Sequence, residues 1–429
     1  MHSESSSRFL LIKHAAEIVT STGTAAKKGA AMNQLEIIKD GAIVIKEGII
    51  DWVGLTSDLP VYNEENLEII DASGCSVIPG FVDSHTHFVF GGYRPEEFFW
   101  RLNGTPYLEI LERGGGILNT VEATCAMGHE AMLKTASNRL DAMLAMGVTT
   151  VEGKSGYGLD LDTELRQLKV MGELNSNHAV EVVPTFMGAH AVPPEYRGRA
   201  DDYVTFIIQK VLPAVVEQGI AEFCDVFCEK GVFSVEQTRK ILQTASVLGL
   251  KTKIHADEIV SFGGAELAAE LEAVSADHLL QASEKGIADM AARGVVATVL
   301  PMTAFCLREE YAEARAIIDS GGAIALATDY NPGSCFSHSI PLLIALAAIQ
   351  LKLSPAEILT ALTLNGAAAV GRADHIGTLE RGKQGDILML KYPSHLFLSY
   401  HTGMDIMDKV IKKGKVVVDK RNGKFGGNR

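Results

Sequence analysis

Short apolar runs recur along the middle of the chain, and each is followed by a stretch with the spacing of an amphipathic helix. The runs are rich in β-branched residues, which is typical of buried strands. They lie at residues 77–87, 147–155, 180–190, 223–231, 250–258, 272–280, 294–303 and 323–333. Strand–helix units repeated eight times within about 250 residues predict a parallel (β/α)8 TIM barrel. A doubly wound open sheet is the alternative, although no Gly-x-Gly-x-x-Gly follows any run.

Helix-like stretches between these runs include residues 201–219, 234–249 and 308–321. Ser234 and Gln237 have the spacing of a capping box, and Gly249 is placed as a helix stop. Both chain ends instead contain short strand-like runs separated by glycine-bearing turns. The first pair predicts a hairpin with glycine in its turn. These runs lie at 42–45, 49–53, 386–390 and 413–418.

Composition narrows the class of protein. The 429 residues are 47% hydrophobic and 7% aromatic, which is typical of a globular α/β enzyme. A formal net charge of -14 gives no general attraction for phosphate backbones, so we expect no nucleic-acid partner. The six cysteines have no disulfide-framework spacing, and the N-terminus lacks a signal-peptide pattern. The longest apolar stretch, 340–351, is too short for a bilayer, so we expect a cytoplasmic protein with no membrane contact.

Histidines stand at the end of the first run. His85 and His87 are two residues apart, so in a strand they point to the same side and can chelate a divalent metal. Pro79, Gly80 and Asp83 precede them and strengthen that interpretation. The alternative is that two polar side chains merely pack near a strand end.

Other strand ends carry residues of the same kind. His255 and Glu258 end the fifth run, His278 ends the sixth, and Asp329 ends the eighth. The carboxyl ends of barrel strands meet at one face, so we expect these side chains to lie together. Three histidines and an aspartate hold one zinc or iron-type ion and leave a place for water, which the ion acidifies. A nearby carboxylate then moves a proton, which predicts metal-assisted hydrolysis.

Two further interpretations stay open at this point. Asp329 could instead cap the following loop. Glu229, at the end of the fourth run, leaves a second metal ion conceivable, although we expect a single ion. The Arg113-Gly-Gly-Gly116 run lacks the Lys-Ser/Thr of a phosphate loop, so we expect a loop over the barrel mouth within 103–120.

The run Pro79-Gly-Phe-Val-Asp-Ser-His-Thr-His87, together with His255, His278 and Asp329, resembles the amidohydrolase superfamily. The resemblance spans nearly the whole chain, because residues 377–386 are similar to the segment that re-enters the superfamily's outer domain. It implies a (β/α)8 barrel over residues 77–376. It also implies a small β-sandwich domain formed by both chain ends, 1–76 and 377–429.

Within that superfamily the chain resembles the imidazolonepropionase family. The matching segments are 85–94, 152–158, 185–190, 255–258 and 328–334. The resemblance implies hydrolysis of the ring C–N bond of 4-imidazolone-5-propanoate to N-formimidoyl-L-glutamate in histidine degradation, and a homodimer. The nearest alternative is a deaminase of a purine, pyrimidine or related heterocycle, which would release ammonia. A catalytically silent scaffold would have lost the metal ligands, which this chain keeps.

The resemblance also implies roles for individual residues. The implied metal ligands are His85, His87, His255 and Asp329, and the implied catalytic residues are Glu258, His278 and Asp329. The implied substrate contacts are Arg94, Tyr157, His190, Glu258, Asn331, Gly333 and Ser334. Arg94 offers a fork of donors that suits the substrate's carboxylate tail, and N–H groups near Gly333 and the Ser334 hydroxyl would assist it. The choice between zinc and iron, and the order of proton transfers, stay open.

Overall fold

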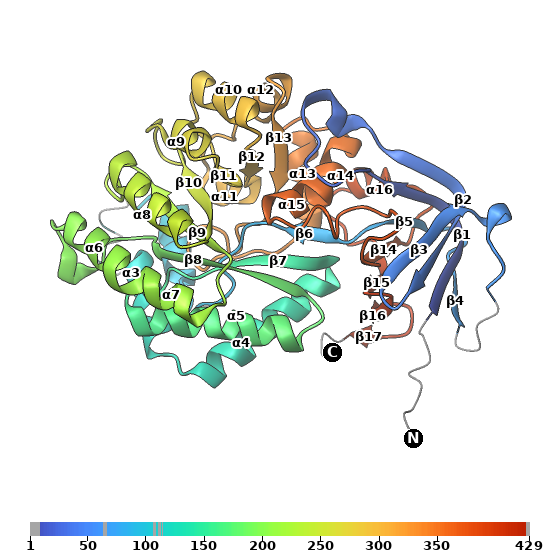
Figure 1. Cartoon of the computed structure of the whole chain (residues 1–429), viewed down its shortest axis with the longest axis horizontal. Helices are drawn as coiled ribbons and strands as arrows, with labels where there is room; N and C mark the ends of the chain where they lie inside the picture. Colours follow the sequence, from blue (N-terminus) through green and yellow to red (C-terminus); the bar gives the residue numbers. More distant parts are fainter. Residues whose placement is uncertain (1–8, 63–66, 106–108, 110–112, 114, 426–429) are drawn as a thin grey trace.

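Eight parallel strands form the centre of the computed structural model, which describes residues 9–62, 67–105, 109, 113 and 115–425 (Figure 1). Each strand lies inside one of the eight predicted runs, so the predicted barrel is confirmed. The strands are β6 (Phe81–Asp83), β7 (Val148–Lys154), β8 (Glu181–Ala189), β9 (Phe223–Cys228), β10 (Lys251–Ala256), β11 (Ser275–His278), β12 (Val296–Val299) and β13 (Ala323–Leu326).

The ring closes just beyond the ends of its first and last strands. Thr86 and Tyr330 form a parallel bridge. The Asp329 N–H donates to the His85 carbonyl at 3.0 Å, and the His87 N–H donates to the Tyr330 carbonyl at 3.0 Å. Backbone pairing therefore joins the two segments that carry three of the four predicted metal ligands.

The first predicted run is divided in the structure. Its beginning, β5 (Ser76–Pro79), belongs to a separate outer sheet, and only β6 belongs to the barrel. Gly80 lies at the crossing and packs against Thr149, where an added Cβ would come within 2.2 Å of Oγ1. The apolar stretch 77–82 continues across this break and conceals it, because both strands are buried.

Helices cover the outside of the barrel and pack their apolar faces on it. The predicted helix at 234–249 is α8, and its capping box is present. The stretch 201–219 is helical but contains a π turn, Ile207–Val211, between α6 and α7. Within 308–321 the prediction was too long, because only α12 is helical and Arg308 ends the preceding helix in the left-handed conformation.

The helices on the barrel's N-terminal half are α1 (Pro95–Leu102), α3 (Ile117–Ala126), α4 (His129–Ala145), α5 (Leu161–Asn177), α6 (Ala200–Phe206) and α7 (Leu212–Gln218). Those that follow are α8 (Val235–Val247), α9 (Gly264–Glu270), α10 (Glu284–Arg293), α11 (Pro301–Leu307), α12 (Ala314–Asp319), α13 (Ile340–Ile349), α14 (Pro355–Leu362), α15 (Leu364–Ala369) and α16 (Phe397–Tyr400). None of the helices that the structure describes is long and apolar enough to cross a bilayer.

Both chain ends build one mixed sheet beside the barrel (Figure 1). Strand β14 from the C-terminal part pairs with β5 from the N-terminal part, and the predicted hairpin is β2–β3, with Val44 opposite Trp52. A second domain from both ends is therefore present. Its other strands are β1 (Phe9–Thr20), β2 (Glu36–Lys46), β3 (Ile49–Leu55), β4 (Leu67–Asp71), β14 (Ile387–Leu390), β15 (Met407–Lys412), β16 (Lys415–Asp419) and β17 (Lys424–Phe425).

The loop predicted over the barrel mouth at 103–120 lies partly outside the described residues. Its described C-terminal part begins at Gly115 and leads into α3.

Candidate functional site

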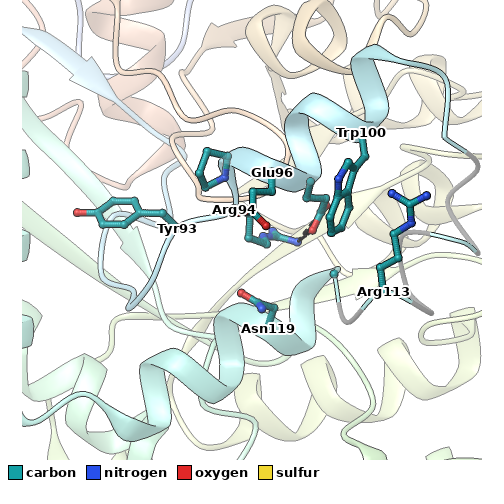
Figure 2. A pocket seen from close by; sticks show the side chains of 9 residues that line it. Tyr93, Arg94, Glu96, Trp100, Arg113 and Asn119 are labelled. Atoms are coloured by element: carbon teal, nitrogen blue, oxygen red, sulfur yellow. Dashed lines mark hydrogen bonds and ion pairs between the residues drawn. The ribbon is translucent and has the colours of Figure 1, made fainter.

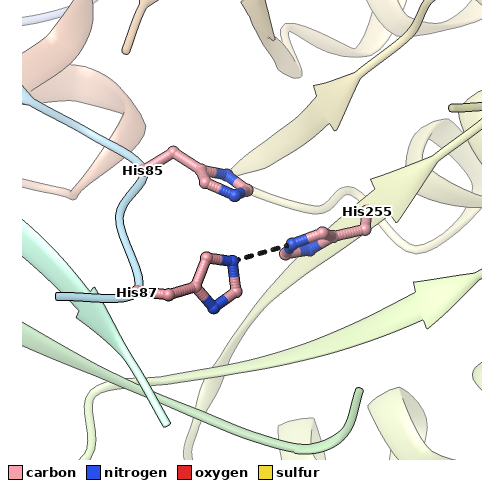
Figure 3. A group of neighbouring side chains, drawn as sticks. All are labelled: His85, His87 and His255. Atoms are coloured by element: carbon pink, nitrogen blue, oxygen red, sulfur yellow. Dashed lines mark hydrogen bonds between the residues drawn. The ribbon is translucent and has the colours of Figure 1, made fainter. Parts of the chain in front are cut away.

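Four side chains converge at the carboxyl end of the barrel, and Figure 3 shows the three histidines among them. His87 Nε2 lies 3.4 Å from His255 Nε2. Asp329 Oδ1 lies 3.5 Å from His85 Nε2 and 3.7 Å from His87 Nε2. All four residues are at most 2% exposed. The structure thus brings together the four residues that the sequence suggested as metal ligands.

Two buried aspartates orient two of these imidazoles. Asp277 Oδ2 lies 2.6 Å from His85 Nδ1, and Asp225 Oδ2 lies 3.0 Å from His255 Nδ1. An ionised carboxylate only accepts, so each Nδ1 carries the proton and each Nε2 turns a lone pair toward the centre.

The donor set fits a divalent ion. His85 Nε2 is buried and has no hydrogen-bond partner, which is costly unless an ion takes its lone pair. Burial lowers the pKa of His85, His87 and His255 well below the usual histidine value, so they stay neutral, as metal ligands must be. Imidazole nitrogens with one carboxylate oxygen suit zinc and iron equally.

Asp329 is held in one orientation. It has a φ of 50°, in the left-handed region, and its Oδ2 accepts a hydrogen bond from Thr303 Oγ1 at 2.7 Å. Oδ1 is thereby left to face His85 and His87. Burial raises the pKa of Asp329 to about 7.

Glu258 and His278 lie beside one another, with Glu258 Oε1 3.6 Å from His278 Nδ1. Burial, followed by the charge of Asp329, raises the pKa of Glu258 to about 8. Burial lowers the pKa of His278 to about 4. At neutral pH, Glu258 therefore holds a proton that it can donate, and His278 has a lone pair that can accept one.

Two aromatic residues border His87 on its open side. The His190 ring stacks on it with centroids 4.9 Å apart, and the Tyr157 ring lies 5.7 Å away. His190 Nδ1–H donates to the Gly156 carbonyl at 3.1 Å, so its Nε2 is the acceptor. Burial raises the pKa of Tyr157 and lowers the pKa of His190 to about 4, and the charge of Arg94 opposes the first shift and adds to the second.

Arg94 lies against the loop that follows β13. Its guanidinium is so close to Gly333 that a Cβ there would come within 1.7 Å of Nη2. Arg94, Gly333 and Ser334 line a cavity of about 410 Å³, together with Cys306 and Phe336.

Asn331 organises this loop from within. Its Oδ1 accepts the N–H groups of Gly333 and Ser334, both at 2.8 Å, and its Nδ2 donates to Ser334 Oγ at 2.8 Å. The two N–H groups expected to bind a carboxylate are therefore already engaged, whereas the Ser334 hydroxyl still has its proton to donate.

Comparison with known proteins identifies the family. The model of the amidohydrolase family matches residues 76–417. Imidazolonepropionase from Clostridium tetani is 56% identical over 412 residues, covering 96% of this chain and 98% of that protein. Imidazolonepropionase from Bacteroides thetaiotaomicron is 58% identical over 408 residues, covering 94% and 98%. The chain belongs to the imidazolonepropionase group of the amidohydrolase family.

Solved structures of lower identity support the fold. An adenosine deaminase from Xanthomonas campestris with bound zinc superposes with a TM-score of 0.69 at 20% identity, covering 96% of this chain and 93% of that one. Atrazine chlorohydrolase from Arthrobacter aurescens in complex with zinc gives 0.70 at 19% identity, covering 97% and 96%. Family membership and the buried donor cluster make this chain a hydrolase with a divalent-metal site.

Sequence reasoning missed the polar interior beneath the histidines. Lys154 Nζ lies 2.7 Å from Asp225 Oδ2 and 2.9 Å from Glu152 Oε2, while Lys253 Nζ lies 3.0 Å from Glu152 Oε1. The signal was available, because Glu152 and Lys154 are two residues apart on β7, which places two charged side chains on the same side of a buried strand.

Glu229, which the sequence left open as a ligand of a second metal ion, binds backbone N–H groups in the structure. Its carboxylate accepts the N–H groups of Lys230 and Ile259, both at 2.8 Å. Among the described residues, the groups able to hold a metal ion do not include it.

Proposed function

We propose that this hydrolase opens the ring C–N bond of 4-imidazolone-5-propanoate and yields N-formimidoyl-L-glutamate, a step of histidine degradation. One observation carries the proposal: the guanidinium of Arg94 lies against Gly333, on the loop that leads away from the metal donor Asp329, and its charge acts on the rings beside His87. That substrate has a hydrolysable ring at one end and a carboxylate at the other. The names of the closely similar relatives agree with this assignment.

We assign zinc or iron to the site, with His85, His87, His255 and Asp329 as its ligands. The ion supplies a Lewis acid that acidifies water and polarises the ring carbonyl. Histidine Nε2 atoms whose Nδ1 protons are engaged by Asp277 and Asp225 hold such an ion in a fixed place.

The chain's own groups move the protons. His278, neutral at its lowered pKa, accepts the proton that the attacking water loses, and Asp329 Oδ1 orients that water. Glu258, protonated at its raised pKa of about 8, donates to the ring nitrogen as the C–N bond breaks. The balance is one water added: its oxygen goes to the carbonyl carbon, Glu258 gives a proton to the leaving nitrogen, and the proton that His278 accepted returns to Glu258, whose Oε1 lies 3.6 Å from His278 Nδ1.

Other residues bind the substrate. Arg94 holds the carboxylate tail through two parallel N–H donors, and the Ser334 hydroxyl adds a third. Tyr157 and His190 pack beside the ring, while Asn331 and Gly333 give the loop its shape. The predicted homodimer and these contacts stay predictions, and light scattering checks the first.

A coupled assay tests the function. Urocanase generates 4-imidazolone-5-propanoate from urocanate in place, and its ultraviolet absorbance is followed with and without the zinc-loaded protein. We expect accelerated loss that yields N-formimidoyl-L-glutamate without ammonia. Ammonia release would point instead to the deaminase alternative, and no acceleration with fully metallated protein would overturn the assignment.

A further inference from the structure

A buried carboxylate that the mechanism does not use lies beside Arg94. Glu97 occupies the first turn of α1 and is 6% exposed. Its Oε2 accepts the N–H of Gly116 at 2.7 Å, and its two oxygens lie 3.4 and 3.3 Å from Arg94 Nη1. Figure 2 shows this region, which lines a second cavity of about 440 Å³, with Arg94 at the start of α1 and Asn119 of α3 across that cavity.

The nitrogen atoms of the Arg94 guanidinium differ in their contacts. Glu97 engages Nη1, whereas Nε is buried and has no hydrogen-bond partner. Nη2 lies against Gly333 on the loop. A carboxylate binds best to two parallel N–H donors, and with Nη1 engaged the remaining edge is Nε with Nη2.

A second arginine associated with α1 also contacts the loop that follows β13. Arg101, two turns after Arg94, donates from Nη2 to the Gly333 carbonyl. The helix and the loop that flank the Arg94 guanidinium are therefore joined by a hydrogen bond of their own.

We propose that Glu97 is a positioning residue that turns the free Nε–Nη2 edge of Arg94 toward the substrate's carboxylate tail. The inference rests on the proposed function, since it assumes a substrate with such a tail. Glu97 touches no reacting atom and acts through Arg94, so its effect belongs in substrate binding and in selectivity for the tail.

Two simpler roles for Glu97 predict different behaviour. In the first, Glu97 only stabilises α1 through the helix dipole, as an acidic residue in a first turn does; Glu96 occupies the same turn but is exposed. In the second, only the charge of Glu97 matters. Its removal would then strengthen binding of an anionic tail, because like charges repel.

The test measures kcat and KM for three variants with 4-imidazolone-5-propanoate and with 4-imidazolone, which has no tail. Glu97→Ala removes the acceptor, Glu97→Gln keeps an acceptor without charge, and Glu96→Ala is the matched control on the same helix turn. We expect Glu97→Ala to raise KM for the tailed substrate about 10-fold with kcat nearly unchanged, the size of a lost hydrogen bond to a charged group. Glu97→Gln and Glu96→Ala should stay within about threefold of the unaltered protein, and 4-imidazolone turnover should not change.

Several outcomes would overturn the inference. An unchanged KM in Glu97→Ala would remove the positioning role, and a lower KM in both Glu97 variants would show that charge alone acts. Equal losses for both substrates would indicate a general structural effect, and thermal unfolding of Glu97→Ala beside Glu97→Gln measures that effect separately. Failure of the proposed function is distinguishable, because the unaltered protein would then turn over neither substrate.

Discussion

The two ends of the site are built in different ways. At the metal end, the donors are at most 2% exposed, stand at or just beyond strand ends, and are oriented by buried aspartates. At the tail end, Arg94 precedes a short helix and meets a loop that Asn331 organises, and Phe336 is 54% exposed. Hydrogen bonds of the barrel therefore hold the metal donors in place, whereas in the proposed function it is the loops that recognise the substrate.

The largest effect should come from disrupting the metal end. His255→Ala removes a ligand, so we expect kcat/KM to fall by about 10³-fold or more, since a bound ion would lower the activation barrier by several kcal/mol. Bound zinc, measured by elemental analysis, should fall well below one per chain. His129→Ala serves as the control and should retain both, since His129 is the first residue of α4 and pairs with Glu173 of α5, away from the metal donors. Full activity in His255→Ala would contradict the ligand assignment.

Disrupting the tail end should change binding instead. Arg94→Met removes two charge-assisted hydrogen bonds to the carboxylate, so we expect KM for 4-imidazolone-5-propanoate to rise about 100-fold. Zinc content should not change, because Arg94 contacts none of the four ligands in the structure. If the turnover of tail-less 4-imidazolone fell equally, Arg94 would not be a tail-binding residue.

The aspartates beneath the histidines should affect the metal end alone. Asp277→Asn keeps the size of the side chain but loses the ionised acceptor for His85 Nδ1, so zinc affinity should fall about 10-fold to 100-fold. Competition with a chromogenic chelator measures it. Asp408→Asn is the matched control, since Asp408 is similarly buried but pairs with Arg421 in the outer sheet. Similar losses in both variants would refute a role specific to the metal.

The smallest effect concerns pH. A carboxyl whose pKa is raised keeps its proton to higher pH, so the donating form of Glu258 is present below about 8 and is lost above it. Above that pH we expect kcat to fall about 10-fold per pH unit, which gives the pH profile an alkaline limb. A bound cation favours the carboxylate, so the limb should begin at a somewhat lower pH in the metal-loaded protein. Glu258→Gln should be slower and lack the limb. A limb that persists in Glu258→Gln would belong to another group.

The residue types at the ends of the predicted strands were enough to predict the metal end. Strand ends in a barrel meet at one face, so His85, His255 and Asp329 could be brought together without knowing any distance. The division of the first run at Gly80 could not be predicted, because hydrophobicity is the same in both strands that it separates. The length predicted for the helix near 308–321 was wrong for a similar reason, because Arg308 takes a left-handed conformation that composition does not signal.

Contacts between distant segments were harder to predict. Lys154 pairs with Asp225, 71 residues further on, and that pairing depends on which strands are neighbours in the ring. The contact of Asn331 with substrate stays a prediction, and the hydrogen bonds of its amide within its own loop gave no signal in the sequence. Glu97 gave no signal in the sequence, since one more acidic residue in a helix's first turn is ordinary.

In the proposed function, one substrate spans both ends of the site. The decisive measurement is the ratio of kcat/KM for 4-imidazolone-5-propanoate to that for 4-imidazolone, with the zinc-loaded protein. We predict a preference of about 100-fold or more for the tailed substrate, which Arg94→Met largely abolishes. Equal kcat/KM values for the two compounds would contradict the claim that one substrate spans both ends, because the tail end would then contribute nothing to recognition.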